Sequence, residues 1–316
     1  MKYIALEEHY LLPEQEPQAT DGFPPELNAQ LNPLLHDITD TRLAEMDKHD
    51  IRLSVLSPTV PGVQQAGLSA QDAIDLARRS NDWLAEQIAD HRDRLRGFAA
   101  LPLQDPGAAV AELERCVREH GFLGALVNDQ TDGHYLDESQ YEPVWEAFEA
   151  LQVPLYLHPN SDQADRWHVL DGYPEMRNAM WSWAPEVSGH AVRLICSGLF
   201  DRHPNARVIL GHAGEMLPFQ MTRLDSRYGL VVKAKPIQRR PSEYLGANVM
   251  ATMSGIFLPP AISAAAACIG ADAFMFSVDY PYEHTSEAVA AFEAAELTDE
   301  DRDMIAHANA ERILGL

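Results

Sequence analysis

The first ten residues end in side chains that could bind a metal ion. Their apolar run gives way to Glu7, Glu8 and His9. In a β-strand successive side chains alternate between the two faces, so Glu7 and His9 are expected to point the same way. A carboxylate oxygen and an imidazole nitrogen on one strand suit a divalent ion such as Zn²⁺ or Mn²⁺. The alternative interpretation is a strand that ends at the surface in three polar residues.

Polar residues also end four later apolar runs of the chain. They are Asn128, His158, His212 and Asp279. Any one of them alone is better explained as a packed or exposed side chain. Because they recur at the same relative place in successive units, together with the amino-terminal pair they indicate one shared metal centre.

The elements that must position these residues follow a repeating pattern of short apolar runs and amphipathic segments. Eight such units predict an α/β protein with a (β/α)₈ barrel of the TIM type, whose active site lies at the carboxyl ends of the strands. An open, doubly wound sheet is the structural alternative, but no Gly-x-Gly-x-x-Gly follows the first strand and no phosphate loop is present. Strands are predicted at 1–10, 51–58, 96–101, 121–128, 153–158, 207–212, 248–253 and 273–279.

Between the strands, apolar residues recur with helical spacing. One further segment, 11–40, is rich in proline and lacks a sustained period, which predicts a long loop that caps the active site. Nothing in the composition suggests a linker, so we expect one domain over 1–316. Helices are predicted at 40–50, capped by Asp40, then at 72–95, 106–120, 139–151, 186–200, 215–228 and 260–269, with a last helix capped by Thr298.

The charge balance restricts the partners. The 316 residues include 48 Asp and Glu against 24 Lys and Arg, a net charge of −24, which argues against nucleic acid and anionic membranes as partners. Three cysteines without a Cys-x-x-Cys pair indicate neither a disulfide framework nor a structural zinc site. With no signal peptide or membrane span in evidence, the expected location is the cytoplasm.

Several motifs extend this pattern into a resemblance that covers nearly the whole chain. They include Ala-Leu-Glu-Glu-His at 5–9, Tyr-Leu-His-Pro at 156–159, Gly-His-Ala-Gly-Glu at 211–215 and Phe-Ser-Val-Asp-Tyr-Pro-Tyr-Glu at 276–283. The chain resembles the amidohydrolase-related decarboxylases, and within them it is most similar to the ortho-hydroxybenzoate decarboxylases of the γ-resorcylate and 2,3-dihydroxybenzoate type. Many hydrolytic relatives begin with His-x-His, whereas Glu-x-His is the form found in the decarboxylase branch.

This resemblance implies one divalent metal ion and no organic cofactor. The ion is expected to be Zn²⁺ or Mn²⁺, with Mg²⁺ possible. His212 and Glu215 match a His-x-x-Glu dyad in which the carboxylate orients the imidazole. The ligands implied by the resemblance are Glu7, His9, His158 and Asp279.

The resemblance also implies a set of substrate-binding residues. Asn128 corresponds to a pocket-lining position, and Arg223 to a helix arginine near the active site. Phe23 and Tyr282 are candidates to sandwich an aromatic ring, although Tyr282 is often Phe in relatives and so adds a hydroxyl to the wall. Relatives form dimers and tetramers, so a homodimer or homotetramer is expected.

The reaction expected from this set is the metal-dependent, non-oxidative decarboxylation of a small ortho-hydroxybenzoate, reversible to ring carboxylation. Either Asp279 or His212 would deliver the proton, and Asp279 is favoured, with His212 and Glu215 positioning the phenol. Two alternatives stay open. The same site could use a bound water to hydrolyse a lactone or amide with Asp279 as base, or the chain could be a non-enzymatic, acidic metal-binding scaffold.

Overall fold

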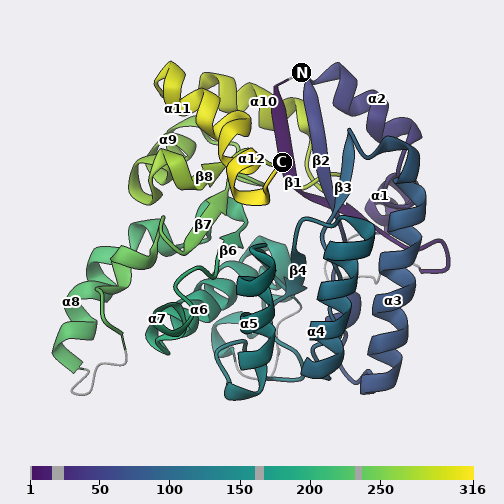
Figure 1. The fold of residues 1–316 in the computed structure, drawn as a ribbon. Helices are drawn as coiled ribbons and strands as arrows, with labels where there is room; N and C mark the ends of the chain where they lie inside the picture. The colour runs from purple at the N-terminus through teal and green to yellow at the C-terminus, as the bar shows by residue number, and fades with distance from the viewer. Residues whose placement is uncertain (1, 16–24, 161–166, 232–236) are drawn as a thin grey trace.

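Eight parallel strands follow one another in sequence order around a barrel (Figure 1). The computed structural model describes residues 2–15, 25–160, 167–231 and 237–316. Within these ranges the strands form a group of three and a group of five. The first group is β1 (Tyr3–Tyr10), β2 (Ile51–Pro58) and β3 (Leu95–Gly97), and the second is β4 (Ala125–Asn128), β5 (Leu155–His158), β6 (Val208–Leu210), β7 (Val249–Thr252) and β8 (Phe274–Met275).

Two isolated parallel bridges join the groups and close the barrel. Ala99 pairs with Ala125 between β3 and β4, and Glu8 pairs with Tyr280 between β1 and the segment after β8. At the second bridge the His9 N–H donates to the carbonyl of Tyr280 over 2.7 Å. The predicted (β/α)₈ barrel is therefore confirmed. The third, fourth, sixth and eighth strands are at most half as long as predicted, because regular pairing covers only the middle or one end of each predicted run.

The helices surround the barrel (Figure 1). Each strand is buried by the helical layer on one side and by the barrel interior on the other, and all eight residues of β1 are buried. The helices are α1 (Pro25–His36), α2 (Asp40–Lys48), α3 (Ala70–Gln87), α4 (Pro106–Arg115), α5 (Glu142–Leu151), α6 (Trp183–Cys196), α7 (Leu199–Arg202), α8 (Met221–Val231), α9 (Pro259–Ile269), α10 (Thr285–Ala294), α11 (Asp299–Asp303) and α12 (Asn309–Leu314).

Side-chain oxygens accept backbone N–H groups at the starts of two helices, one of which was predicted with the wrong capping residue. The Thr298 hydroxyl accepts the Asp301 N–H over 3.1 Å, as predicted for the last helical region. The prediction that Asp40 caps α2 is wrong. Asp40 is the first helical residue, and the Asp37 carboxylate accepts the N–H groups of Asp40 and Thr41 over 2.9 and 2.7 Å.

The largest difference from the sequence prediction is α1, which lies inside the segment 11–40 that we predicted to be loop. Pro25 is its first residue, where a missing N–H costs nothing, but Pro33 lies within the helix and hides the pattern. Leu31 and Leu35 recur four residues apart and pack on Leu11. This tertiary packing outweighs the local cost of Pro33. A second helix that the sequence analysis did not anticipate is α10.

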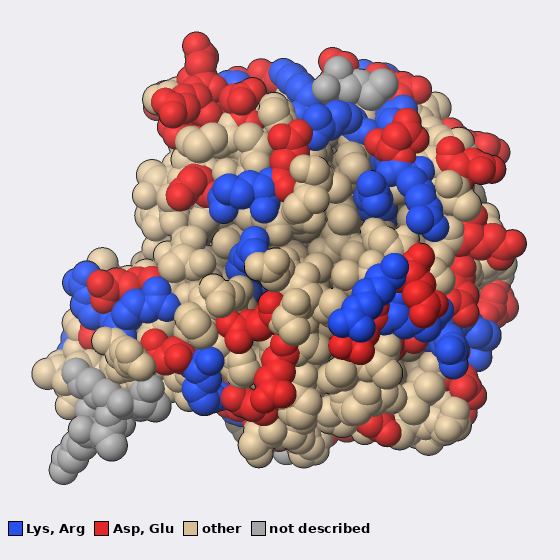
Figure 2. Space-filling view, viewed as in Figure 1, with Lys and Arg blue, Asp and Glu red and all other residues tan. Residues whose placement is uncertain are grey.

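The acidic composition is spread over the surface. Figure 2 shows Asp and Glu side chains mixed with Lys and Arg, with acidic groups gathered over α11 at the upper left. Among the described residues, no helix combines the length and apolar character needed to cross a bilayer. A single domain over 1–316 stays a prediction.

Candidate active site

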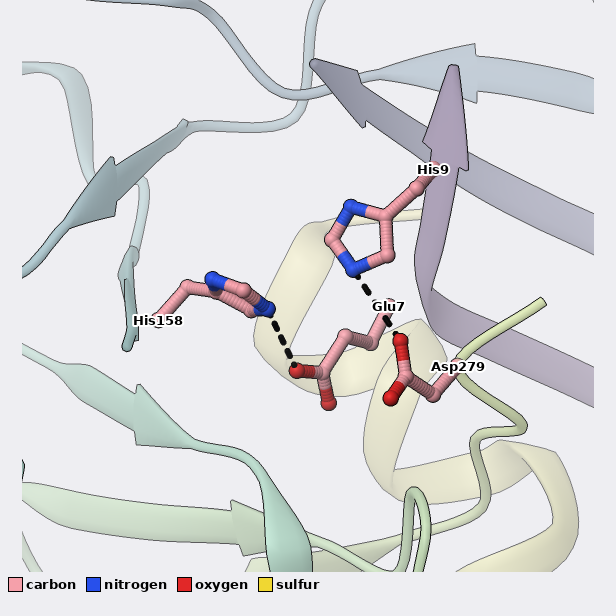
Figure 3. Close-up of side chains that lie close together, drawn as sticks. All are labelled: Glu7, His9, His158 and Asp279. Atoms are coloured by element: carbon pink, nitrogen blue, oxygen red, sulfur yellow. Dashed lines mark ion pairs between the residues drawn. The ribbon is translucent and has the colours of Figure 1, made fainter. Parts of the chain in front are cut away.

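Four side chains from three parts of the barrel point toward one another at its carboxyl-terminal rim (Figure 3). Glu7 and His9 come from β1, His158 ends β5, and Asp279 follows β8. One ligand atom from each lies within 4.8 Å of the others. Nε2 of His9 is 3.1 Å from Oδ1 of Asp279, and Nε2 of His158 is 3.4 Å from Oε1 of Glu7. The structure thus brings together the four residues that the sequence analysis grouped as metal ligands.

Several polar atoms of this cluster are buried without a hydrogen-bond partner. They are Oε1 of Glu7, both ring nitrogens of His9 and Oδ1 of Asp279. Each such atom costs on the order of 1–3 kcal/mol when it is left without a partner. A divalent cation would satisfy Oε1 of Glu7, Nε2 of His9 and Oδ1 of Asp279 at once. Two carboxylates with two imidazoles are a donor set that Zn²⁺ or Mn²⁺ accepts. The residues present therefore fit a metal ion.

The Glu7 carboxylate is oriented by groups from β5 and from the segment after β7, neither of which pairs with β1. The Tyr156 hydroxyl donates to its Oε2 over 2.6 Å, and the Ser254 hydroxyl donates to the same oxygen. Gly211 leaves room for this carboxylate, because a Cβ there would lie 2.7 Å from Oε2. The sequence analysis missed Tyr156 and Ser254. Tyr156 could have been found, since it stands two residues before His158 and so faces the same side of β5.

His158 is held in one tautomer. Its Nδ1–H donates to Oδ1 of Asn128 over 2.9 Å and lies 2.8 Å from the carbonyl of Pro159, so Nε2 faces Glu7. Burial, with His9 and His212 nearby, lowers the pKa of His158 well below its ordinary value. The ring is therefore neutral, which is the form that binds a metal ion.

His212 and Glu215 form the expected dyad beside the cluster. The Nδ1–H of His212 donates to Oε1 of Glu215 over 2.8 Å, and Nε2 lies 3.7 Å from Oδ2 of Asp279 and 3.8 Å from Oε1 of Glu7. Burial alone would lower the pKa of His212, but the charges of Glu215 and Glu7 and the contact with Asp279 raise it well above its ordinary value. Burial likewise opposes ionisation of Asp279, but His212 and His9 lower its pKa.

Three of these residues have left-handed backbone angles that only a supporting structure can hold. φ is 48° at His212, 56° at Glu215 and 79° at Asp279. Non-glycine residues in this region are strained by roughly 1–3 kcal/mol each, and such positions concentrate at functional sites. The turns after β6 and β8 therefore trade stability for the direction in which these side chains point.

A cavity of about 200 Å³ opens onto the cluster. This volume exceeds the roughly 150 Å³ of an apolar core cavity that holds benzene. Tyr282 packs edge-on against His9, with ring centroids 5.7 Å apart at 64°. Trp183, the first residue of α6, is part of the wall. The lining comprises His9, His158 and Asp279, the α1 residues Leu27, Asn28, Leu31 and Leu35, and Thr59, Val60, Ala179, Trp183, Tyr282 and Glu283.

Comparison with known proteins agrees with this geometry. A family model described as Amidohydrolase matches residues 21–316. The chain belongs to the amidohydrolase family. This confirms the resemblance seen in the sequence motifs.

Within the amidohydrolase family, this chain is strongly similar to decarboxylases. The γ-resorcylate decarboxylase of Rhizobium sp. (strain MTP-10005) is 43% identical over 321 residues, covering 99% of this chain and 98% of the relative. A crystal structure of 2,6-dihydroxybenzoate decarboxylase complexed with 2,6-dihydroxybenzoate superposes with a TM-score of 0.94 at 42% identity, covering 100% of this chain and 99% of the other. The structure of the dihydroxybenzoic acid decarboxylase of Polaromonas sp. JS666, with bound manganese and the inhibitor 2-nitroresorcinol, superposes with a TM-score of 0.95 at 40% identity. The match covers 100% of this chain and 97% of the other.

Three residues of this amidohydrolase that we predicted to bind substrate are not found in the cluster with the candidate metal ligands. Asn128 is 2% exposed and lies behind His158, and its amide Nδ2 donates to the carbonyl of Pro61 over 3.3 Å. Arg223 is exposed on α8, and within the described ranges no contact joins its side chain to the cluster. Phe23 lies outside the described residues. Their substrate-binding roles stay predictions.

The opposite face of β1 carries a second buried carboxyl group, that of Glu8, which was not used in the prediction from sequence. Glu8 accepts hydrogen bonds from the Val278 N–H over 3.2 Å and the Ser277 hydroxyl over 3.3 Å. Burial raises the pKa of Glu8 to about 8, although Arg42 opposes this shift. The Arg42 guanidinium donates to the carbonyl of His9 over 2.6 Å and lies 4.7 Å from the centre of the Tyr280 ring.

Arg42 therefore links α2 to the two segments that carry the cluster. Its side chain is 2% exposed, so its charge and donors depend wholly on these partners. His9 is itself a candidate ligand, and Tyr280 directly follows Asp279. We infer that Arg42 is a positioning residue for the candidate site.

Replacing Arg42 by Met is expected to lower the free energy of unfolding by about 3 kcal/mol, because the carbonyls of His9 and Asp37 lose their charged donor. Urea denaturation followed by circular dichroism measures this change. Arg118→Met is the matched control, since Arg118 is 63% exposed and pairs with Glu114 at 3.3 Å. That control should change stability by less than about 1 kcal/mol. Equal effects of the two variants would contradict the anchoring role of Arg42.

Proposed function

We propose that this chain is a metal-dependent, non-oxidative decarboxylase of an ortho-hydroxybenzoate of the γ-resorcylate (2,6-dihydroxybenzoate) type. The observation that carries the proposal is the buried cluster of unpartnered ligand atoms at the base of an apolar, ring-sized cavity. The 43% identity with a γ-resorcylate decarboxylase over almost the entire chain supports the same reaction.

The metal ion would be held by Glu7, His9, His158 and Asp279. Zn²⁺, Mn²⁺ and Mg²⁺ are candidates, and the manganese in the Polaromonas relative favours Mn²⁺. When bound, such an ion supplies positive charge that orients the substrate carboxylate and its ortho oxygen and stabilises the phenolate. We expect no organic cofactor.

The reaction needs a proton at the ring carbon that carries the carboxylate, while the ortho oxygen supplies electrons to the ring. In its carboxylate form, Asp279 takes the proton of the ortho hydroxyl and delivers it to that carbon. The carbon–carbon bond then breaks, CO₂ leaves, and its electron pair restores the aromatic phenolate. Returning a proton to this oxygen completes the cycle. By microscopic reversibility, the site also carboxylates the ring at high bicarbonate.

His212 is the group that we propose to return this proton. Its Nδ1 is held by Glu215, so Nε2–H is directed toward the cluster, 3.7 Å from Asp279. Before the reaction, a hydrogen bond from Nε2–H of His212 would position the phenol oxygen of the substrate. Glu215 keeps the imidazole oriented and compensates its charge.

The cavity wall suits an aromatic acid. Leucines of α1 would contact the aromatic ring of the substrate, and Tyr282 would provide an aromatic surface next to His9. Phe23, Asn128 and Arg223 remain part of the proposed substrate set. A substrate seated on the ligand atoms would exclude the water that a lactone or amide hydrolase needs.

Incubation with 2,6-dihydroxybenzoate, 2,3-dihydroxybenzoate, salicylate and 5-carboxyvanillate tests the reaction. We expect CO₂ release, greatest for a dihydroxybenzoate, that falls at least about 100-fold after chelation and returns with Mn²⁺, because the ion stabilises the developing phenolate. Loss of the aromatic acid and release of CO₂ are both measured, on protein with its metal content determined. Bound metal without CO₂ from any of these acids would refute the proposal and favour lactones or amides as substrates.

His212→Asn separates catalysis from metal binding. Because His212 lies outside the ligand set, the variant should retain the metal ion while kcat falls by about 10²–10⁴-fold, the usual loss for a proton-transfer group. Metal content and kcat are measured on the same sample. His168→Asn is the control, since its side chain is 93% exposed. Unchanged turnover in His212→Asn would support the non-enzymatic scaffold instead.

We also propose that the chain forms a homodimer or homotetramer and acts in the cytoplasm. Large apolar side chains are exposed near the cavity and on α8, which projects from the body of the protein (Figure 1). Ala179, which lines the cavity, lies in the first of these stretches. The exposed residues are Val169, Tyr173, Met180 and Trp181, and on α8 Leu230 and Val231.

Light scattering of the purified protein should give two or four times the chain mass of 35.2 kDa. Trp181→Glu is expected to shift the mass toward that of one chain, because it places a charge in an apolar contact. Tyr3 and Trp145 are buried and unaffected by this change, so circular dichroism serves to verify folding. A wild-type mass of one chain at micromolar concentration would rule out a stable oligomer.

A further inference from the structure

A pair of hydroxyl groups stands in the otherwise largely apolar outer wall of the cavity. The hydroxyls of Thr59 and Tyr282 lie 2.6 Å apart and are hydrogen-bonded, with either as the donor. Both residues line the cavity, and Tyr282 packs against the leucine cluster that includes Leu31 and Leu35 of α1. We propose that Thr59 and Tyr282 form a specificity element that binds a second hydroxyl on the substrate ring, in addition to the ortho hydroxyl next to the carboxylate.

The pair is fixed relative to the candidate ligands. Thr59 directly follows β2, is 4% exposed, and donates its backbone N–H to the carbonyl of Tyr10 over 3.0 Å. Tyr282 stands three residues after Asp279, and its ring packs on His9. A ring held by the cluster therefore meets this pair at a set position, which is the requirement for reading a substituent.

The chemistry of two hydroxyls allows them to bind a third. Each carries one hydrogen and two lone pairs, and their mutual bond engages one hydrogen and one lone pair. Since either can be the donor, the pair can accept from a phenol of the substrate or donate to it. A methyl group at the same place has no hydrogen to donate and no lone pair to accept, so it makes no hydrogen bond with the pair.

Thr59 contributes to the recognition of the substrate hydroxyl both directly and by orienting the Tyr282 hydroxyl. The tyrosine hydroxyl can rotate out of line with the ligand, and a hydrogen bond to a buried threonine restricts this rotation. Losing either oxygen should therefore remove most of the selectivity. This inference rests on the proposed function, because it names which hydroxybenzoates the decarboxylase prefers.

The test compares matched substrates in which only a hydroxyl is exchanged for a methyl group. The pairs are salicylates with a hydroxyl or a methyl at ring position 3, 4, 5 or 6, including 2,6-dihydroxybenzoate against 6-methylsalicylate. For each pair, the ratio of kcat/KM is determined in the wild type and in Tyr282→Phe, Thr59→Val and the double variant. Differences in intrinsic reactivity cancel, because each pair is compared across variants.

We expect the hydroxyl-to-methyl ratio at one ring position to fall about 10-fold or more in Tyr282→Phe and in Thr59→Val. The double variant should lose little more than either single one, since the two hydroxyls act as a unit. Thr59→Ser, which keeps the oxygen, should restore most of the ratio. A merely structural role would change kcat/KM for both members of a pair alike and leave every ratio unchanged, which would overturn the inference.

A binding measurement keeps this test separate from that of the proposed function. Calorimetric titration with resorcinol and with 3-methylphenol compares the same two groups without any turnover. A lower preference for resorcinol in Tyr282→Phe supports the hydroxyl pair, and an unchanged preference together with unchanged kinetic ratios refutes it. Absence of CO₂ from every acid in the wild type refutes the decarboxylase proposal, and the substrate preference falls with it.

Discussion

The structure depends on the burial of charge at the end of β1. Glu7, Glu8 and His9 are all less than 3% exposed, in a strand that helices and the barrel interior enclose. Such groups are stable only when each finds a partner of opposite charge or a hydrogen bond. On one face the Val278 N–H and the Ser277 hydroxyl donate to Glu8 with Arg42 nearby, and on the other face unpartnered atoms of Glu7 and His9 suit a cation. The same alternation of side chains thus builds an anchor behind the strand and a ligand set in front of it.

The way in which the barrel closes serves this arrangement. β8 has only two regular residues, and a single bridge then joins Glu8 to Tyr280. A longer regular ladder would fix the direction of Asp279 by strand alternation. Instead, the chain leaves the strand early and turns through a left-handed residue, which directs the carboxylate toward His9. The cost of that turn is offset by Arg42, which packs on Tyr280 and holds the neighbouring segment.

The cavity combines two environments that an aromatic acid requires. Its lining includes the candidate ligands His9, His158 and Asp279, and it also includes leucines of α1 with Tyr282 and Thr59. A polar head and an apolar ring therefore find matching surfaces in one orientation, so binding itself places the reacting carbon. His212, oriented by Glu215, is the group proposed to protonate the phenolate oxygen during the reaction.

What the sequence by itself determined are the features that depend on local order. Alternation along β1 predicted that Glu7 and His9 act together, polar residues at strand ends predicted His158 and Asp279, and the repeating βα pattern predicted the barrel. The His-x-x-Glu spacing predicted a dyad because three residues suffice for its contact.

Only the tertiary structure decided which distant side chains support this site. Tyr156 and Ser254 meet at Glu7, Arg42 reaches His9, and Thr59 meets Tyr282 across more than two hundred residues of sequence. Helix α1 is likewise stabilised by packing that its local sequence, with Pro33 inside, does not reveal. The physical reason is the same in each case. Periodicity reports which way a side chain points, whereas hydrogen bonds and packing depend on what the closed barrel places opposite it.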